Sequence, residues 1–561
     1  MPRPRQVTDA LCPGVRKVGD MAQVPTAKTV AEHMAARLVA EGVDVVFTVP
    51  GEQIDPLMGA IAETDIRIVP ARHEQAAAFM AYGYARSTGR IGVHAVISGP
   101  GVLHSTAGLA LGYSGDARML CLAGQIPTKA LGRGYGVPHE IPDQLGVLAS
   151  LTGWAARVET PESVNAVLGE AFHRLGTRRP RPVAVEVPAD VLAATVAVPD
   201  TWTEPETDRS PDPTAVAAAL ELLASARTPM IFVGSGARGC AAEITRLAER
   251  LRAPVTSELG GRGIVGDDHE LAIAYPAAHR LWPRADVVLA IGTRFMRPQV
   301  EWGLDDDLKV IRIDLDAEEI ERVAAPDVAL VGDASEAVAA LSAGLGDVDD
   351  RESWLAEVKE AQRAVEADVA RLVPQVDFIR AMRGALPRDG FFVDELTQVG
   401  YTARVAFPVF GPSTYVPATY QGGLGFGFAT ALGVQVAHPG RPVLSVSGDG
   451  GFLYTATELA TAVQHRIPVV AVVFNDNCYA NIARSQRSLL GRTVATDLHN
   501  PDFVAFAESF GAHGVLAHGP DDLAAEIAAA LARADGMPTV IEVPVAEMPS
   551  PWSLIRLPRV R

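Results

Sequence analysis

The sequence predicts an α/β fold whose parallel sheets form three doubly wound units. Apolar runs typical of strands alternate with helical segments along the whole chain, which is the pattern of parallel βαβ architecture. A chain of 561 residues exceeds the size of a single core, so several domains are expected. A polar, proline-rich break at residues 199–213 and a charged helical stretch at 349–371 separate the three units.

The elements of each unit follow from these apolar runs. In the first unit, strands are predicted at residues 44–49, 93–97, 119–123 and 183–187, with a helix at 75–87. In the second, strands are predicted at 230–233, 287–291 and 310–313. In the third, strands are predicted at 391–393, 443–446, 469–474 and 539–543, with a helix at 455–465. The tail, residues 549–561, is expected to be loosely ordered.

Composition excludes several classes of partner. A net charge of −18 and a pI near 5.2 argue against nucleic acid and against an anionic membrane surface. The chain has no apolar run of about 18 residues, the length that a membrane helix needs. Residues 1–23 lack the apolar segment of a secretory signal, and we expect a disordered extension, with Met21 as an alternative first residue.

The four cysteines, Cys12, Cys121, Cys240 and Cys478, have no metal-binding spacing. Reduced thiols in a cytoplasmic protein are therefore expected.

The most informative motif lies in the third unit. The predicted strand at 443–446 leads into Ser447-Gly448-Asp449-Gly450-Gly451, and the next apolar run ends in Asn475-Asp476-Asn477. Asp449 and Asp476 stand 27 positions apart, each at the C-terminal end of a predicted parallel strand. Mg²⁺ is usually held by one or two carboxylates together with substrate phosphates. Glycine turns and helix N-termini supply the N–H groups for those phosphates.

This pattern resembles the diphosphate-binding motif of thiamine-diphosphate (ThDP) enzymes. Three further segments resemble the same family: residues 72–78 (RHEQAAA), 98–101 (SGPG) and 421–427 (QGGLGFG). The resemblance covers about residues 24–548 and is closest to the acetolactate synthase (large subunit)-like branch. It implies a pyrimidine-binding domain at 24–195, a middle domain at 213–345 and a diphosphate-binding domain at 372–548.

The resemblance also implies the ligands of the cofactor. Mg²⁺ would be held by Asp449, by Asp476, which replaces the family's asparagine, and by the carbonyl of Cys478. The diphosphate site would be lined by Thr397, Gln398, Gly448, Gly450 and Gly451. The Gly422 carbonyl would hold the 4′-amino group, and Leu424 would wedge between the two rings of a bent cofactor.

The resemblance implies catalytic roles for several residues of the first unit. Glu74 would hydrogen-bond N1′ of the cofactor, and Gln125 would face the reaction intermediate. His73 would aid proton transfer, with a packed or solvent-bridged histidine as the equal alternative. Glu52 would bias against anionic acceptors or donate a proton, with a salt-bridged loop residue as the alternative. His104 stands where many relatives carry asparagine. Two interpretations of it are left open: a side chain that faces the reaction space, and one that does not.

A nucleotide site is left open in the middle unit. Residues 234–239 (GSGARG) follow a predicted strand and fit the G-x-G-x-x-G pattern of dinucleotide sites. FAD, as in some relatives, or another nucleotide is one interpretation. A structural strand-to-helix turn is the other.

The implied function is a ThDP- and Mg²⁺-dependent 2-oxo acid decarboxylase/carboligase that forms an enamine and joins it to a second carbonyl. Because Glu74 and Asp449 lie in different domains, which come from different subunits in this family, a homodimer or homotetramer is implied. Gly153 replaces a lysine typical of the synthase, and the segment after Tyr479 lacks its tryptophan. Two alternatives therefore stay open: a non-ligating decarboxylase of the benzoylformate or phenylpyruvate type, and a catalytically silent regulatory subunit.

Overall fold

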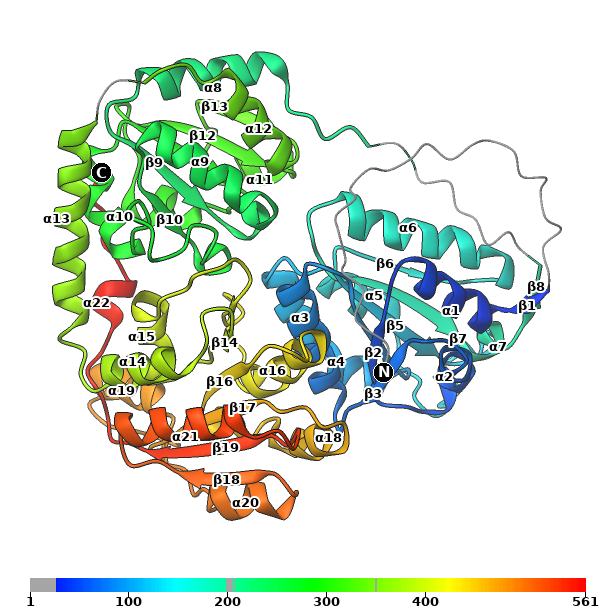
Figure 1. Ribbon diagram of the computed structural model, residues 1–561. Coiled ribbons are helices and arrows are strands. Elements are labelled where there is room, and N and C mark those ends of the chain that lie inside the picture. The colour runs from blue at the N-terminus through cyan, green and yellow to red at the C-terminus, as the bar shows by residue number, and fades with distance from the viewer. Residues whose placement is uncertain (1–26, 198–204, 206, 349–350) are drawn as a thin grey trace, which may run out of the picture.

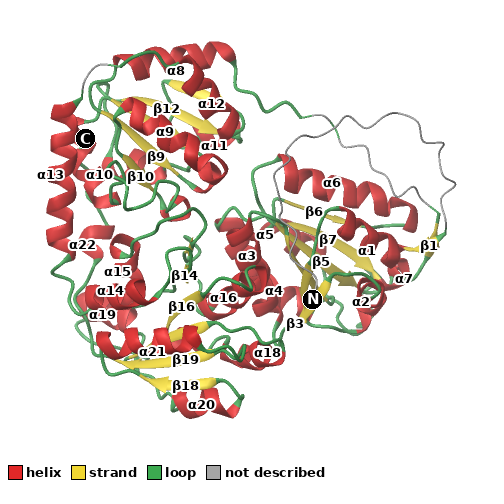
Figure 2. Ribbon diagram, viewed as in Figure 1, coloured by secondary structure: helices red, strands yellow, loops and turns green. Residues whose placement is uncertain are grey.

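The computed structural model describes residues 27–197, 205, 207–348 and 351–561. The predicted extension at 1–23 and part of the predicted linker lie outside these residues. The described chain forms three parallel sheets with helices packed around them, which confirms the predicted fold class (Figures 1 and 2). In Figure 1 the N-terminal domain is blue to cyan, the middle domain is green, and the C-terminal domain is yellow to red.

The N-terminal domain has a six-stranded parallel sheet with strand order β3-β2-β4-β5-β7-β6. Its strands are β2 (Val45–Thr48), β3 (Arg67–Pro70), β4 (Gly92–Val96), β5 (Met119–Gln125), β6 (Trp154–Arg157) and β7 (Val183–Pro188). Its helices are α1 (Val30–Ala40), α2 (Asp55–Ala62), α3 (Glu74–Thr88), α4 (Pro100–Ser114), α5 (Gln144–Leu151), α6 (Val164–Thr177) and α7 (Ala189–Leu192). A short antiparallel pair joins β1 (Lys28–Thr29) to β8 (Thr195–Val196).

The middle domain has a five-stranded parallel sheet with order β10-β9-β11-β12-β13. Its strands are β9 (Pro229–Val233), β10 (Val255–Ser257), β11 (Val287–Ile291), β12 (Lys309–Asp314) and β13 (Val328–Val331). Its helices are α8 (Pro213–Ser225), α9 (Ala241–Leu251), α10 (Tyr275–Leu281), α11 (Ala317–Glu321) and α12 (Ala334–Gly344). The long helix α13 (Glu352–Val369) runs from this domain toward the C-terminal domain (Figure 1).

The C-terminal domain repeats the topology of the first, with strand order β15-β14-β16-β17-β19-β18. Its strands are β14 (Phe391–Val393), β15 (Tyr415–Val416), β16 (Val443–Gly448), β17 (Val470–Asn475), β18 (His513–Leu516) and β19 (Thr539–Pro544). Its helices are α14 (Gln375–Ala385), α15 (Gln398–Ala406), α16 (Phe426–Ala437), α17 (Asp449–Phe452), α18 (Leu459–Gln464), α19 (Ala480–Leu490), α20 (Phe503–Ser509) and α21 (Pro520–Ala532). The helix predicted at 455–465 is shorter, because its first turn is a 3₁₀ helix at Ala456–Glu458.

Helices α3 and α16 join the cores of the N- and C-terminal domains. Almost all of α3 is buried, which suits a helix that is apolar on every side. Glycines allow the two backbones to approach closely: a Cβ added at Gly83 would lie 2.1 Å from the carbonyl oxygen of Thr430. A Cβ added at Gly433 would lie 2.0 Å from the carbonyl oxygen of Met80. This contact fixes how the two domains sit against each other.

The expectation of a loosely ordered tail is wrong. The tail contains α22 (Trp552–Ile555) and then crosses to the middle domain (Figure 1). Leu557 is buried in the aromatic core around Trp282. The Nε of Arg561 donates a hydrogen bond of 2.8 Å to the Trp282 carbonyl. The tail is ordered by these contacts with residues distant in sequence, which the local sequence of the short segment does not reveal.

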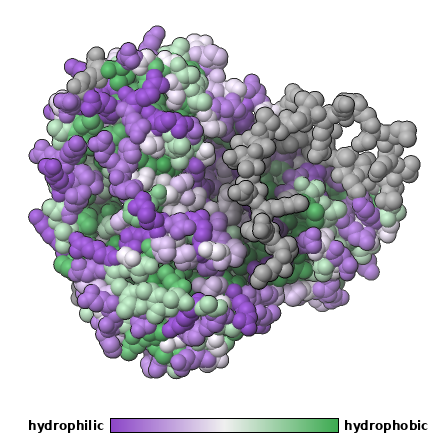
Figure 3. Space-filling view, viewed as in Figure 1, coloured by the Kyte–Doolittle hydropathy of each residue, from purple (hydrophilic) through white to green (hydrophobic). Residues whose placement is uncertain are grey.

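The described part of the visible face is largely hydrophilic (Figure 3). Figure 3 shows hydrophilic residues spread over the described part of the visible face, with smaller hydrophobic areas between them. Among the described residues, no helix is both long enough and apolar enough to cross a bilayer.

Candidate functional site

The predicted diphosphate site forms a cavity of about 280 Å³ at the carboxyl ends of β14, β16 and β17. Strand order reverses between β14 and β16, and ligands of open α/β sheets bind at such a switch point. The cavity is lined by the metal ligands and by the cofactor ligands predicted in the C-terminal domain: Thr397, Gln398, Gly422, Leu424, Gly448, Asp449, Gly450, Gly451, Asp476 and Cys478. Residues from four separate segments therefore meet at one place.

Backbone donors face this cavity from α15. Thr397 caps the helix, with its Oγ1 accepting a hydrogen bond of 2.7 Å from the Gly400 N–H. The start of a helix presents N–H groups without intrahelical partners, which suits a phosphate. Gly450 packs against the ring of Tyr479, so a side chain at this position would collide with that ring. Leu424 is half-buried at the cavity, just before α16 begins.

Two carboxylates stand together in the cavity. Asp449 accepts hydrogen bonds from the Gly450 N–H (2.8 Å) and the Asn500 amide (2.7 Å), and burial raises its pKa. Burial and the charge of Asp449 raise the pKa of Asp476 to about 6. Two neighbouring buried carboxylates form a donor set that fits a hard divalent cation such as Mg²⁺.

Three side chains of this site were not predicted from the sequence. Asn500 bridges Asp449 and the Asn475 side chain (3.0 Å), and no motif marks it. Arg484 donates to the Oε1 of Gln398 (3.1 Å), whose amide in turn donates to Asp476 (2.9 Å). Glu395 is fully buried beneath the loops, and an acidic residue just after the apolar strand β14 was the signal that could have found it.

Glu395 links the two glycine-rich segments. Its Oε1 accepts a hydrogen bond from the Gly425 N–H. Its carboxylate also lies where side chains at Gly427 or Gly451 would sit, 2.8 Å and 2.5 Å from the added Cβ atoms. Burial raises the pKa of Glu395 to about 7.

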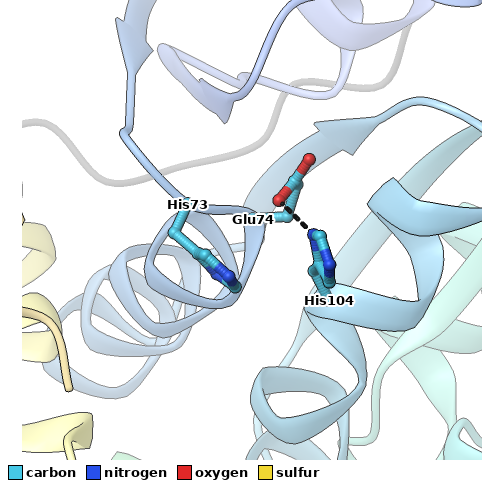
Figure 4. A group of neighbouring side chains, drawn as sticks. All are labelled: His73, Glu74 and His104. Carbon is cyan, nitrogen blue, oxygen red and sulfur yellow. Dashed lines mark hydrogen bonds and ion pairs between the residues drawn. The ribbon is translucent and has the colours of Figure 1, made fainter.

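The second predicted half of the site lies at the start of α3. Glu74 is the first residue of this helix and is buried, with 8% of its surface exposed. Its Oε2 lies 3.0 Å from the Nδ1 of His104, which projects from α4 (Figure 4). His73 caps α3, since its Nδ1 accepts a hydrogen bond of 3.1 Å from the Gln75 N–H. Burial lowers the pKa of His73.

The C-terminal domain also holds this helix start. The backbone N–H groups of Arg72 and His73 donate to the buried carboxylate of Glu458, at 3.0 and 3.1 Å. Burial raises the pKa of Glu458. Glu74 is therefore positioned by contacts with both domains.

Gln125 and Glu52 occupy different environments. Gln125 ends β5 and is buried, with its amide donating to Glu186 (3.1 Å) and its Oε1 accepting from the Ile126 N–H (2.7 Å). Glu52 is exposed at the start of the 3₁₀ helix Glu52–Ile54. The structure thus places Gln125 within a hydrogen-bond network and Glu52 at the surface.

Comparisons with known proteins agree with this arrangement. The N-terminal TPP binding domain of thiamine pyrophosphate enzymes matches residues 28–147, the central domain matches 216–341, and the C-terminal TPP binding domain matches 397–543. The chain is 34% identical to the "Probable 2-ketoarginine decarboxylase" of Pseudomonas aeruginosa, over 87% of this chain and 89% of the relative.

The chain belongs to the thiamine pyrophosphate enzyme family. It also resembles acetolactate synthases. It is 31% identical to the "Probable acetolactate synthase large subunit" of Methanocaldococcus jannaschii, over 88% of each chain. It is 29% identical to the "Acetolactate synthase isozyme 3 large subunit" of Escherichia coli, over 89% of this chain and 92% of the relative.

The family's two cofactor-binding domains correspond to the two halves of the site. Glu74 lies in the N-terminal TPP binding domain, and Asp449 lies in the C-terminal one. The cavity around Asp449 is lined by residues between 395 and 548, and among the described residues the N-terminal domain contributes none of its lining.

A second cavity, of about 820 Å³, lies where the three domains meet. Gly234, the first glycine of the predicted nucleotide motif, lines it, and Arg86 and Arg404 face it from the other two domains. Arg86 is 4% exposed, and its Nε and Nη1 have no hydrogen-bond partner among the described residues. The predicted motif continues as a 3₁₀ helix, Ser235–Cys240, before α9 begins.

Proposed function

We propose that the protein is a ThDP- and Mg²⁺-dependent 2-oxo acid decarboxylase and carboligase. The observation that carries the proposal is the cavity at the β14/β16 switch point, where the cofactor and metal ligands expected from the C-terminal domain meet around Asp449. Family membership and the buried Glu74 at the start of α3 support it. When bound, ThDP supplies a carbon nucleophile that adds to the carbonyl of a 2-oxo acid and takes up the electrons released with carbon dioxide.

The chain's own residues divide the work of binding. Asp449, Asp476 and the Cys478 carbonyl would hold Mg²⁺, which neutralises the diphosphate. The N-terminus of α15 and the Gly450–Gly451 backbone would donate hydrogen bonds to the phosphate oxygens. The Gly422 carbonyl would orient the 4′-amino group, and Leu424 would keep the two rings of the cofactor bent.

Proton control falls to Glu74. Its carboxyl would hold a proton at N1′ of the pyrimidine ring, so that the 4′-nitrogen is in the form that can accept a proton from C2. Gln125 would face the reaction intermediate from within its hydrogen-bond network, and His73 would aid proton transfer. Glu52, exposed at the surface, would bias against anionic acceptors or donate a proton.

The test of this function is Glu74→Gln. The variant should bind ThDP as the wild type does, measured by calorimetry, yet exchange the C2 proton of bound ThDP slower by orders of magnitude. Glu63→Gln, which changes an exposed carboxylate at the end of α2 in the same domain, is the matched control and should keep fast exchange. Exchange at the wild-type rate in Glu74→Gln would refute the role of Glu74.

The second part of the proposal concerns whether the carbon unit left after decarboxylation is joined to a second carbonyl or is released as an aldehyde. The relatives include both a named decarboxylase and named synthases, so both outcomes have support. Incubation with pyruvate alone separates them: acetolactate indicates ligation, and acetaldehyde indicates simple decarboxylation. 2-Ketoarginine is the second substrate to test, because a named relative is described as acting on it. A silent regulatory subunit would leave every substrate unchanged, and the presence of Glu74 and Asp449 argues against it.

We also propose that the active unit is at least a homodimer, with Glu74 of one subunit completing the cavity of another. The lining of the Asp449 cavity by the C-terminal domain supports this. Mixing inactive Glu74→Gln and Asp449→Asn chains should restore about a quarter of wild-type activity, because half of the dimers are mixed and each has one intact site. No recovery after subunit exchange would contradict a shared site.

The cavity at the junction of the three domains is proposed to take a nucleotide such as FAD. Its support is the buried guanidinium of Arg86, whose Nε and Nη1 lack a hydrogen-bond partner among the described residues, together with the glycine turn at Gly234. Visible absorbance and mass analysis of the purified protein test for flavin. Their failure to detect any nucleotide would favour a structural turn.

A further inference from the structure

Two histidines contact the start of α3, and the proposed function gives His104 no role. Helices α3 and α4 pack closely, because a Cβ added at Gly108 would lie only 2.3 Å from the Cβ of Ala78. His104 precedes Gly108 by one helical turn, and Glu74 precedes Ala78 by one turn. The same close packing therefore brings the imidazole of His104 against the Glu74 carboxylate, 3.0 Å away.

This contact is the carboxylate's main restraint. Among the described residues, His104 is the hydrogen-bond partner that the Glu74 carboxylate has. Figure 4 shows the bonded oxygen facing His104 and the other carboxylate oxygen pointing away from both imidazole rings. One oxygen is thus held while the second stays available.

The hydrogen bonds assign opposite tautomers to the two histidines. The Nδ1 of His73 accepts a hydrogen bond from the Gln75 N–H, so in the neutral ring the proton is on Nε2. When the Glu74 carboxylate carries no proton, it can only accept a hydrogen bond, and the Nδ1 of His104 is then the donor that faces it. The two rings are neighbours: their centroids lie 4.8 Å apart and their planes are tilted by 31°. Two adjacent histidines therefore carry their protons on different ring nitrogens.

We propose that His104 is a positioning residue for Glu74: its Nδ1–H holds one carboxylate oxygen, so that the other is aimed at the cofactor's pyrimidine ring. The inference rests on the proposed function for the identity of that ring. The hydrogen bond itself does not depend on it. His73 has a separate task, since it caps α3 and so fixes the backbone from which Glu74 projects.

The first test uses the cofactor-free protein. Nitrogen-15 NMR of histidine-labelled full-length protein, at a pH where imidazoles are neutral, distinguishes the two tautomers. We expect the Nδ1–H form for His104 and the Nε2–H form for His73. Glu74→Met removes the acceptor, and His104 should then change to the Nε2–H form while His73 does not change. An Nε2–H tautomer for His104 in the wild type would overturn the inference.

The second test measures exchange of the C2 proton of bound ThDP. His104→Leu should slow exchange by about 10- to 100-fold, because the carboxylate is no longer held in place. His104→Asn, whose side-chain amide can donate a similar hydrogen bond, should remain within about threefold of the wild type. Equal rates for the leucine and asparagine variants would overturn the inference, since a merely structural role would not distinguish them.

The two proposals fail in distinguishable ways. If Glu74→Gln exchanges at the wild-type rate, the proposed function fails, whatever the tautomer of His104. If Glu74→Gln is slow but His104→Leu is not, the proposed function stands and the role of His104 is refuted.

Discussion

The close contact between α3 and α16 makes a sharp prediction about Gly433→Ala. The added Cβ would lie 2.0 Å from the Met80 carbonyl oxygen, and ordinary contact begins at about 3.4 Å. The two helices would therefore have to part by about 1.4 Å, the difference between these distances. The obstructing atoms belong to the backbone of α3, so no side-chain rotation relieves the overlap.

The magnitude follows from two opposing effects. Overpacking a core costs about 1–3 kcal/mol, and the upper value applies because the obstruction is backbone. Alanine is a better helix former than glycine by about 1 kcal/mol, which offsets part of this cost. We expect a net loss of about 2 kcal/mol, seen as a lower urea midpoint, together with weaker ThDP binding, because α3 begins at Glu74 and α16 follows Leu424.

The control is Gly59→Ala. Gly59 lies in helix α2 with no other atom within 4 Å of the added Cβ. The helix propensity gain then acts alone, and stability should be unchanged or slightly higher. If Gly433→Ala is as stable as Gly59→Ala, the reasoning about the α3–α16 contact is wrong.

Three further predictions concern the site and the tail. Burial raises the pKa of Glu395 from 4.5 to about 7 in the folded protein. As pH rises through this window, the unfolded chain loses the proton before the folded chain does, so the free energy of unfolding of the wild type falls. Glutamine does not titrate, so the free energy of unfolding of Glu395→Gln should not fall in this way. Measured by urea unfolding, the free energy of unfolding of the variant minus that of the wild type should rise by about 3 kcal/mol between about pH 5 and about pH 8. Gln398→Leu removes the hydrogen bond to Asp476 and should weaken Mn²⁺ binding, followed by electron paramagnetic resonance, about 10- to 100-fold. Leu557→Ala should destabilise the protein by about 2 kcal/mol, because it opens a space in the middle-domain core.

Each of these predictions has an outcome that contradicts it. A stability difference between Glu395→Gln and wild type that does not vary with pH would mean that Glu395 is ionised in the folded protein. Unchanged Mn²⁺ affinity in Gln398→Leu would mean that the hydrogen bond from Gln398 to Asp476 does not support metal binding. A Leu557→Ala variant as stable as wild type would mean that the tail does not pack on the middle domain in solution.

The sequence by itself determined the α/β architecture, and it predicted the residues that line the cavity at the carboxyl ends of β14, β16 and β17. Apolar runs such as 469–474 are continuous, and 443–446 is interrupted only by Ser445, because parallel strands are buried on both faces, so these strands could be located without a structure. Asp449 and Asp476 were found because each follows such a strand directly, and the carboxyl ends of neighbouring parallel strands meet at one edge of the sheet. Local patterns of this kind depend on residues close together in the chain.

Only the tertiary structure decided the contacts between distant segments. The pairing of His104 with Glu74 depends on how α4 packs on α3, and the approach of Gly433 to Met80 depends on how two domains dock. Arg484, Asn500 and the ordered tail were missed for the same reason. Such contacts join residues tens to hundreds of positions apart, and a single sequence carries no periodic or compositional signal for them because the partners are selected by packing.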